Sequence, residues 1–453
     1  MNVLLISTYE LGRQPFGLAS PAAWLKRAGA RVSCADLSRQ PLPEAAVRQA
    51  DLVAFYLPMH TATRLAVRVL PQVRELNPRA HLCFYGLYAP VNEAYLRRLG
   101  AETILGGEFE AGLVSTVERL RERGSSAQRE PTVLLARQSF IVPDRTGLPP
   151  LAKYAHLNHA DGNPRIVGAT EASRGCKHLC RHCPIVPVYH GVFRIVQREV
   201  VLEDIRQQAA AGAEHITFGD PDFFNGIGHA IELARAFHRE FPKLTYDVTI
   251  KIEHLLRHAE HLSTLRETGC MLVTSAAESV DDRVLGKLAK GHTFADFAAV
   301  VNLCRETGLT LAPTFVAFTP WTTLEGYCEL LGRLAELELI EQIAPIQLGI
   351  RLLIPAGSRL LELEEIRAIL QPFDEAALVY PWANQDPRVD ELAEEVLEVA
   401  LDGERRKLSR RQIFGEVWKR ARQAVGGHAP PLPEASDRVA RAAIPYLTEP
   451  WYC

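Results

Sequence analysis

Two stretches of the chain alternate short apolar segments with helical patterns, and this alternation restricts the possible folds more than any other feature. In the first stretch the apolar segments have the length of buried strands and cover residues 2–7, 31–38, 51–59 and 81–89. Helical patterns over residues 21–30 and 63–78 lie between them. Strands that alternate with helices favour a parallel sheet covered on both faces. Residues 1–123 are therefore predicted to form a doubly wound, Rossmann-like α/β domain.

The alternation restarts after a Pro-, Gly- and polar-rich segment, residues 124–165, which we interpret as a linker or strap. Six strand candidates follow, and their sequences are RIVGAT, HITFGD, TYDVTIKI, CMLVTSA, LTLAPTFVAF and IAPIQLGIRLLI. Six β/α units predict a partial (β/α)6 barrel over residues 166–355, with its chemistry at the carboxyl ends of the strands. Residues 356–453 are predicted to be a mostly helical extension that ends in a cysteine tail.

Composition excludes several classes of protein. The formal net charge is −3 and there is no long basic run, so we do not expect a nucleic-acid partner. No apolar run approaches the roughly 18 residues of a membrane span, and the first residues lack the pattern of a signal peptide. Nine cysteines, an odd number, favour reduced thiols over disulfides. We expect a cytoplasmic protein that does not enter a membrane.

One segment, RGCKHLCRHCP at residues 174–184, gathers three cysteines directly after the first strand of the second stretch. Cys176, Cys180 and Cys183 are spaced C-x3-C-x2-C, and three thiolates suit an iron–sulfur cluster or zinc. Zinc would take a fourth ligand, and no second C-x2-C pair supplies one. The candidates for that ligand are the histidines of this region, His178, His182 and His190.

The cysteine motif and its place after a first barrel strand resemble those of radical S-adenosylmethionine (SAM) enzymes. The resemblance implies that the three thiolates hold a [4Fe–4S] cluster whose fourth iron binds SAM. It also implies one-electron cleavage of SAM to a 5′-deoxyadenosyl radical, an electron donor such as flavodoxin or ferredoxin, and an unidentified small-molecule or peptide substrate. The position before the third cysteine is commonly aromatic in that family and contacts adenine, and here it is His182. The alternative is a zinc-binding module without turnover.

Further SAM contacts are implied at the ends of two later strands. Gly219 and Asp220 stand where the family commonly has a Gly-Gly-Glu turn that binds the SAM amino group, although this chain reads Gly-Asp-Pro-Asp. The alternative is that this segment is a strand-to-helix turn in which an Asp caps the helix. Glu278 and Ser279, followed by VL and KG, resemble the corresponding stretch of the tRNA-methylthiolating and cobalamin-associated branches. Glu278 would then pair with the cationic end of SAM.

Residues 1–122 resemble the cobalamin-binding-like domains that precede some radical SAM barrels. The segments that carry the resemblance are GLASPAAWLKRAGARVSCADLS, ADLVAFYLPMHT, YGLYA and GGEFEAGL. The Asp-x-His-x-x-Gly motif that supplies an axial histidine in some of these proteins is absent. Cobalamin is thus a candidate cofactor, and cobalamin-dependent methyl transfer is a candidate reaction. His60, after the third strand, is more typical of a structural histidine.

The ending TEPWYC resembles the tail of radical SAM proteins named for a Cys-Sec-Ala-Glu-Pro or Cys-Cys-Ala-Glu-Pro sequence. That resemblance implies a selenoprotein in which translation continues past Cys453, and it makes Cys453 part of a redox pair or a soft-ligand arm. The alternative is a docking tail with an inert thiol.

Overall fold

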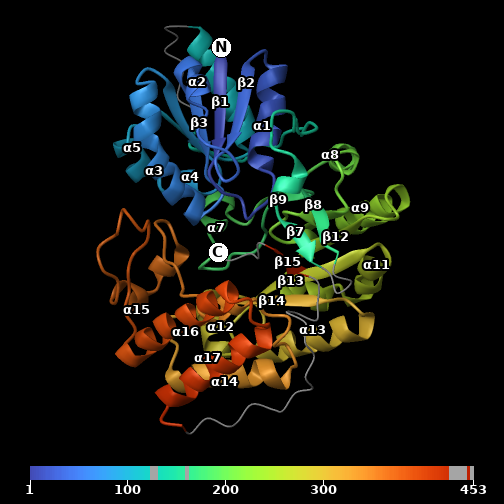
Figure 1. Cartoon of the computed structure of the whole chain (residues 1–453), viewed down its shortest axis with the longest axis vertical. Helices are drawn as coiled ribbons and strands as arrows, with labels where there is room; N and C mark the ends of the chain where they lie inside the picture. The colour runs from blue at the N-terminus through green and yellow to red at the C-terminus, as the bar shows by residue number, and fades with distance from the viewer. Residues whose placement is uncertain (123–130, 159–162, 428–445, 449–453) are drawn as a thin grey trace.

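A computed structural model describes residues 1–122, 131–158, 163–427 and 446–448. Two sheets, one from each alternating stretch, organise these residues (Figure 1). The α/β fold class predicted from the sequence is confirmed: the first sheet is parallel, the second is a curled half-barrel, and the last long helices lie in the C-terminal region. No helix among the described residues has the length and apolar character that a membrane span requires.

The first sheet has the strand order β2-β1-β3-β4-β5-β6, and every pair in it is parallel. Its strands are β1 (Asn2–Ser7), β2 (Arg31–Asp36), β3 (Leu52–Tyr56), β4 (His81–Tyr85), β5 (Thr103–Gly107) and β6 (Val133–Leu134). The helices of this region are α1 (Phe16–Arg27), α2 (Glu44–Gln49), α3 (His60–Leu76), α4 (Tyr88–Val91), α5 (Glu93–Arg98) and α6 (Phe109–Arg121). Two apolar cores, one on each face of the sheet, bury β1, β3, β4 and β5 almost completely, which explains their continuous apolar runs. The edge strand β2 is partly exposed and β6 is half-buried.

The second sheet has the order β14-β13-β12-β11-β8-β7-β15. Its strands are β7 (His156–Asn158), β8 (Arg165–Thr170), β11 (His215–Phe218), β12 (Thr245–Thr249), β13 (Cys270–Glu278), β14 (Leu311–Phe315) and β15 (Tyr446–Leu447). From β8 to β14 all neighbours are parallel, whereas β7 and β15 add an antiparallel edge. A separate antiparallel pair, β9 (Ser173–Gly175) and β10 (Phe193–Ile195), follows β8.

Helices cover the outside of the half-barrel and extend beyond it. Those of the β/α units are α7 (Val186–Tyr189), α8 (Arg198–Ala210), α9 (Ile227–Glu240), α10 (Ile252–Arg257), α11 (Leu262–Glu267), α12 (Asp282–Leu288), α13 (Phe294–Thr307) and α14 (Leu324–Glu336). Later helices are α15 (Glu364–Arg367), α16 (Pro387–Arg405) and α17 (Arg410–Ala424). Short 3-10 turns are η1 (Leu151–Lys153), η2 (Phe223–Gly226), η3 (Ala259–His261), η4 (Pro345–Leu348) and η5 (Arg359–Glu362). One large apolar core joins the sheet to these helices.

The sixth predicted strand of the barrel is reduced to a single parallel bridge between Arg351 and Phe318. Its first half forms η4, because Pro345 lacks the N–H that a strand ladder requires. The side-chain Oε1 of Gln347 instead accepts a hydrogen bond from the backbone N–H of Phe315, at 3.1 Å. The half-barrel therefore closes on this side through a side chain and one bridge rather than through a full strand.

The predicted linker is more ordered than its composition suggested. Its residues contribute β6 to the first sheet and β7 to the second. Arg145 of this segment also forms a nearly buried ion pair with Asp204 of α8, with Nε 2.7 Å from Oδ1. Residues 131–158 thus connect the two sheets through both backbone pairing and a side-chain contact.

The carboxyl edges of the two sheets face each other. In Figure 1 the first sheet begins at the outer end of the molecule, beside the N-terminus, and its strands run toward the half-barrel. The hydroxyl of Tyr189 in α7 donates to the carbonyl of Gly107, the last residue of β5, at 3.3 Å. Open parallel sheets and β/α barrels both bind ligands at the carboxyl ends of their strands. A ligand-binding site of the first sheet or of the half-barrel is therefore expected in the region between the two sheets.

Substitution of Gly17 by Ala should destabilise the first sheet. A Cβ atom on Gly17 in α1 would lie 2.1 Å from Cζ of Tyr56, and that ring is itself packed against Tyr85 and Phe109. We expect a cost of about 1–3 kcal/mol from overpacking. The matched control is Gly332→Ala in α14, where nothing lies within 4 Å and helix propensity favours Ala by roughly 1 kcal/mol. Thermal unfolding measures the stability of both variants. A Gly17→Ala protein with an unfolding temperature as high as that of Gly332→Ala would contradict the packing described.

Candidate functional site

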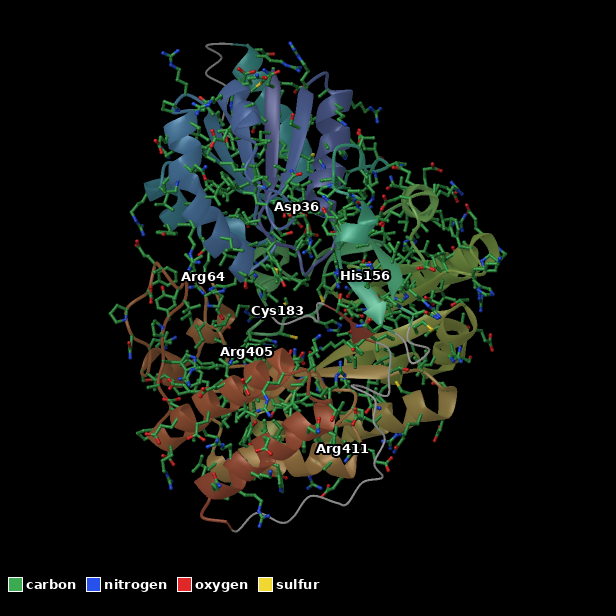
Figure 2. All side chains as sticks on the ribbon, in the orientation of Figure 1. Asp36, Arg64, His156, Cys183, Arg405 and Arg411 are labelled. Atoms are coloured by element: carbon green, nitrogen blue, oxygen red, sulfur yellow. The ribbon has the colours of Figure 1, made fainter. Side chains whose placement is uncertain are left out.

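The three clustered cysteines lie on a loop that leaves the half-barrel at the carboxyl end of β8. Gly175, which precedes Cys176, has φ +72°, and a Cβ there would lie 2.5 Å from the carbonyl oxygen of Val192. Only glycine fits this turn. Neighbouring elements hold the loop: the Arg181 N–H donates to the carbonyl of Leu288, and the Lys177 N–H donates to Oδ1 of Asn225. Figure 2 labels Cys183 in the region between the two sheets.

The loop brings together three thiols that have no disulfide partner. Cys180 is buried, while Cys176 and Cys183 are half-buried. Burial, and to a smaller extent the neighbouring charge of Cys180, raise the pKa of the Cys183 thiol to about 12. The pKa of Cys176 is raised as well, first by burial. Metals bind the thiolate form, so deprotonation here requires a positive group close to the three sulfur atoms.

The three sulfur atoms are not gathered as closely as ligands of a single zinc ion. A tetrahedral zinc ion with Zn–S bonds of 2.3 Å holds its sulfur ligands about 3.8 Å apart. Among the described residues, the three thiols do not form a group whose ligand atoms all lie within 4.8 Å of one another. Two of the three predicted fourth zinc ligands are directed elsewhere, since His178 faces Asp222 and His182 faces Glu278. The third, His190, is exposed at the end of α7. A cluster places each cysteine on a different iron, so its thiolates stand further apart.

Three side chains in contact lie beside the thiols: Glu278 and Lys290, which are buried, and His182, which is half-buried. The Nε2 atom of His182 lies 3.0 Å from Oε1 of Glu278, and Lys290 donates to the same oxygen at 3.2 Å. Although burial raises the pKa of Glu278, Lys290 and His182 lower it to about 2, so the carboxylate is ionised. Burial lowers the pKa of Lys290, but Glu278 and the thiols Cys180 and Cys183 raise it above its usual value. Lys290 is thus a cation held beside the cysteine loop.

The other predicted SAM contacts have structural partners of their own. The Asp220 carboxylate is buried, accepts from the Ser173 hydroxyl, and accepts from the Ala172 N–H at 2.9 Å. The Gly219 N–H donates to the carbonyl of Thr170 at 2.7 Å. The hydroxyl of Ser279 accepts from the Asp281 N–H at 3.1 Å, in the turn that begins α12. His182 and Glu278 are in contact, whereas Asp220 supports the segment that precedes the cysteines. Cys453 lies outside the described residues.

A buried arginine, Arg174, connects the cysteine loop to the first sheet. Its Nη2 lies 2.6 Å from Oε1 of Glu110 in α6, and its Nε lies 2.6 Å from Oε2 of Glu171. Glu108 is 3.5 Å from Nη1, and burial raises the pKa of that carboxyl to about 7. Although burial also raises the pKa of Glu110, Arg174 lowers it below its usual value. Three rings surround the guanidinium at 5.0–5.6 Å from its central carbon, those of Phe16, Phe109 and Phe140.

Sequence reasoning missed three parts of this site. Lys290 belongs to the KG pair that supported the family resemblance, but the pattern did not show that its side chain would turn back to Glu278. Arg174 is one of several basic residues in the motif, and nothing local separates it from the others. Asp222 is the second aspartate of the Gly-Asp-Pro-Asp turn, and the local sequence does not show that it lies between His178 and His254.

Comparison with known proteins agrees with this geometry. Residues 170–322 match the Radical SAM superfamily. The chain is 24% identical over 331 residues to the hopanoid C-3 methylase of Methylococcus capsulatus (strain ATCC 33009 / NCIMB 11132 / Bath), which covers 70% of this chain and 64% of that protein. The chain therefore spans a little less than two thirds of the length of that curated relative.

Two solved structures share the fold of most of the chain. The radical SAM methyltransferase TsrM from Kitasatospora setae, solved with tryptophan and a SAM analogue, has a TM-score of 0.65 at 18% identity, covering 82% of this chain and 78% of that one. The cobalamin-dependent SAM radical enzyme OxsB, with aqua-cobalamin and SAM bound, has a TM-score of 0.66 at 12% identity, covering 89% and 66%.

The chain therefore carries a radical SAM domain over residues 170–322. Such a domain works with a [4Fe–4S] cluster and SAM, and it requires a reductant.

Replacement of Arg174 by Met should weaken the connection between the two sheets. The change leaves Glu110 and Glu171 buried without their cation, and breaking a buried ion pair in this way costs about 3–5 kcal/mol. We expect a lower unfolding temperature and faster limited proteolysis of residues 131–158. The control is Arg388→Ala, which removes an exposed pair with Asp386 and should cost less than about 1 kcal/mol. Equal effects of the two substitutions would argue against a supporting role for Arg174.

Proposed function

We propose that the protein is a radical SAM enzyme in which Cys176, Cys180 and Cys183 hold the [4Fe–4S] cluster. The observation that supports this most strongly is the position of three unpaired thiols on one loop, at the carboxyl end of a parallel half-barrel and opposite a second parallel sheet. When bound, the cluster and SAM supply one-electron reductive cleavage of SAM. The residues of the chain then have to hold, neutralise and shield these groups.

Glu278 is the residue we assign to the cationic end of SAM. Its Oε1 accepts from both His182 and Lys290, and among the described residues no hydrogen bond reaches Oε2. The second oxygen is therefore available to an ammonium group. Glu278 also has φ +67°, a conformation that is strained for a residue other than glycine and that tends to occur at functional sites.

Lys290 and His182 support this assignment from two sides. Lys290 is a buried cation next to Cys180 and Cys183, so it offsets the negative charge that three thiolates would bring. His182 orients the Glu278 carboxylate through its Nε2 atom, and we propose that its ring stacks on adenine. Gly219 and Ser279 are proposed to contribute backbone and hydroxyl contacts, and Asp220 to hold the segment in which Ser173 lies.

A second candidate function is cobalamin-dependent methyl transfer, and the opposed carboxyl edges favour it. The loops that follow β1, β3 and β4 face the half-barrel, and a corrin bound there would lie opposite the cluster loop. When bound, cobalamin supplies a methyl carrier. His60 is not free to act as its axial ligand, because Nε2 lies 2.6 Å from the carbonyl oxygen of Ala377. We therefore propose binding through residues 8–16, 57–59 and 86–90 without a histidine ligand.

We propose a flavodoxin or ferredoxin as the electron donor, a small-molecule or peptide substrate, and action in the cytoplasm. Membership of the family with a Cys-Sec-Ala-Glu-Pro or Cys-Cys-Ala-Glu-Pro tail, and a redox role for Cys453, remain proposals that rest on the TEPWYC ending.

Loss of the three cysteines should abolish the radical chemistry. After anaerobic purification, reconstitution with iron and sulfide, and reduction, we expect about four irons per chain and formation of 5′-deoxyadenosine from SAM. The C176A/C180A/C183A variant should contain no cluster and form none. Cys34→Ala, which changes a half-buried cysteine of β2, should behave as the unmodified enzyme. Stoichiometric zinc in the unmodified protein with no cleavage of SAM would favour the zinc-binding module instead.

Cobalamin binding can be tested by its spectrum. We expect the protein to take up one corrinoid per chain, and the reduced Co(II) form to show no nitrogen hyperfine splitting in its electron paramagnetic resonance spectrum. His60→Ala should leave that spectrum unchanged because His60 is already bonded to Ala377. Nitrogen splitting that disappears in the variant would identify His60 as an axial ligand, and a protein that takes up no corrinoid would remove the second candidate.

A further inference from the structure

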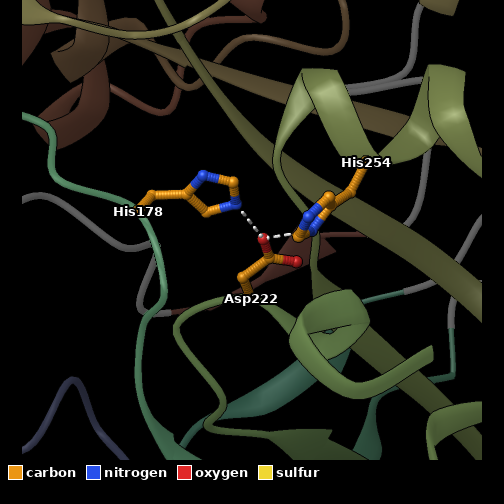
Figure 3. A group of neighbouring side chains, drawn as sticks. All are labelled: His178, Asp222 and His254. Carbon is orange, nitrogen blue, oxygen red and sulfur yellow. Dashed lines mark ion pairs between the residues drawn. The ribbon is translucent and has the colours of Figure 1, made fainter. Parts of the chain in front are cut away.

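Within and beside the cysteine loop, one half-buried and two buried side chains from different parts of the half-barrel converge on one point (Figure 3). His178 lies within the loop, between Cys176 and Cys180. Asp222 follows β11, and His254 belongs to α10, which follows β12. None of the three is among the cysteines that we assign to the cluster.

The contacts between these side chains are short. The Nε2 atom of His178 lies 3.3 Å from Oδ2 of Asp222, and Nδ1 of His254 lies 2.6 Å from the same oxygen. All three atoms lie within 4.8 Å of one another. His254 is fully buried, with 0% exposure, and Asp222 is 1% exposed.

Despite these distances, the contacts do not have the geometry of good hydrogen bonds. The three converging atoms are buried and have no hydrogen-bond partner of acceptable geometry among the described residues, and the same is true of Nε2 of His254. Buried polar atoms without partners are costly, and a native structure normally pairs them. The other oxygen of Asp222 is used, since Oδ1 accepts from the Phe224 N–H at 3.1 Å and caps η2.

A metal ion explains both the convergence and the missing hydrogen bonds. Ligands of one metal direct their lone pairs at the ion rather than at each other, so they approach closely without hydrogen-bond alignment. With bonds of about 2.0–2.2 Å, tetrahedral ligands stand roughly 3.3–3.6 Å apart. The His178–Asp222 distance has this value, and the His254–Asp222 contact would open slightly. Two imidazoles and one carboxylate form a donor set that suits Zn²⁺ and related divalent ions.

We propose that His178, Asp222 and His254 bind one divalent transition-metal ion, of which Zn²⁺ is the representative, at a site separate from the iron–sulfur cluster. The ion fastens the middle of the cysteine loop to the segments that follow β11 and β12. This proposal does not depend on the reaction that the cluster performs.

A metal on Nε2 of His178 requires one change of partner at Nδ1. A metal-bound histidine carries its proton on the other ring nitrogen and commonly donates it to a carboxylate. As the side chains stand, Nζ of Lys251 donates to Nδ1 at 3.2 Å, and Oε2 of Glu253 lies 3.7 Å from Nδ1, beyond hydrogen-bond distance. Lys251 also pairs with Glu253 at 3.2 Å, so it keeps that partner when Nδ1 takes the proton and turns toward the Glu253 carboxylate.

Metal analysis of the holoenzyme tests the site. After anaerobic reconstitution and supplementation with Zn²⁺, we expect about one zinc per chain in addition to the cluster iron. Asp222→Asn and His254→Ala should each lower the affinity for Zn²⁺ at least about 10-fold while iron and sulfide stay at the level of the unmodified enzyme. The control is His258→Ala, a half-buried histidine one helical turn beyond His254, which should keep the zinc.

Titration with Co²⁺ gives a readout that is independent of the cluster and of SAM cleavage. In the C176A/C180A/C183A background, which removes the competing thiols, one equivalent of Co²⁺ should produce visible absorption of a nitrogen- and oxygen-ligated ion, and Zn²⁺ should displace it. Adding Asp222→Asn, which keeps the size of the side chain and its cap on η2, should abolish the signal with unchanged circular dichroism.

Each outcome decides the proposal. Extra Fe²⁺ that is lost in the same two variants supports the site as zinc does. A zinc-supplemented holoenzyme that contains only cluster iron, or an extra metal that remains in both variants, overturns it. Failure of SAM cleavage with one zinc still bound would contradict the proposed function and leave the metal site standing.

Discussion

The buried guanidinium of Arg174 is the contact on which the relation between the two sheets depends. It is 5% exposed, it lies one residue before the glycine that turns the cysteine loop, and it pairs with a carboxylate from each side of the interface, Glu171 and Glu110. Buried charges are stable only when they are paired and hydrogen-bonded. The alignment of the first sheet and the alignment of the loop are therefore fixed by the same group. A shift of either sheet would separate Arg174 from one of its partners.

The sequence predicts the parts of the structure that depend on local spacing. The strands β1, β3 and β4 are recognisable because each is an almost continuous buried run. The cysteine loop is recognisable because its three thiols lie within eight residues. The apolar run of the sixth barrel strand misleads, because a turn at Pro345 takes the place of the strand ladder. The backbone N–H of Phe315 donates instead to the side-chain oxygen of Gln347. The strands of the predicted linker are only two or three residues long, too short to show a period.

The parts of the site that the sequence did not reveal depend on contacts between distant residues. Glu110 and Arg174 are 64 positions apart, and Lys251 and His178 are 73 apart. Each is an ordinary charged or polar residue in its own segment, and only the packing of the sheets makes it part of a site. The pairing of Lys290 with Glu278 spans only 12 positions, but it requires that α12 fold back over the end of β13, which no local pattern encodes.

The basic residues of the cysteine loop show how its conformation is imposed from outside. They are not an anion-binding patch, because each is directed at a different neighbour: Lys177 at Asn225, His178 at Asp222, Arg181 at the carbonyls of Gly286 and Lys287, and His182 at Glu278. Together these contacts reach the segments that follow β11 and β13. A loop held in this way has its conformation determined by contacts with the rest of the chain. Small zinc domains differ, because in them metal binding itself provides the folding energy.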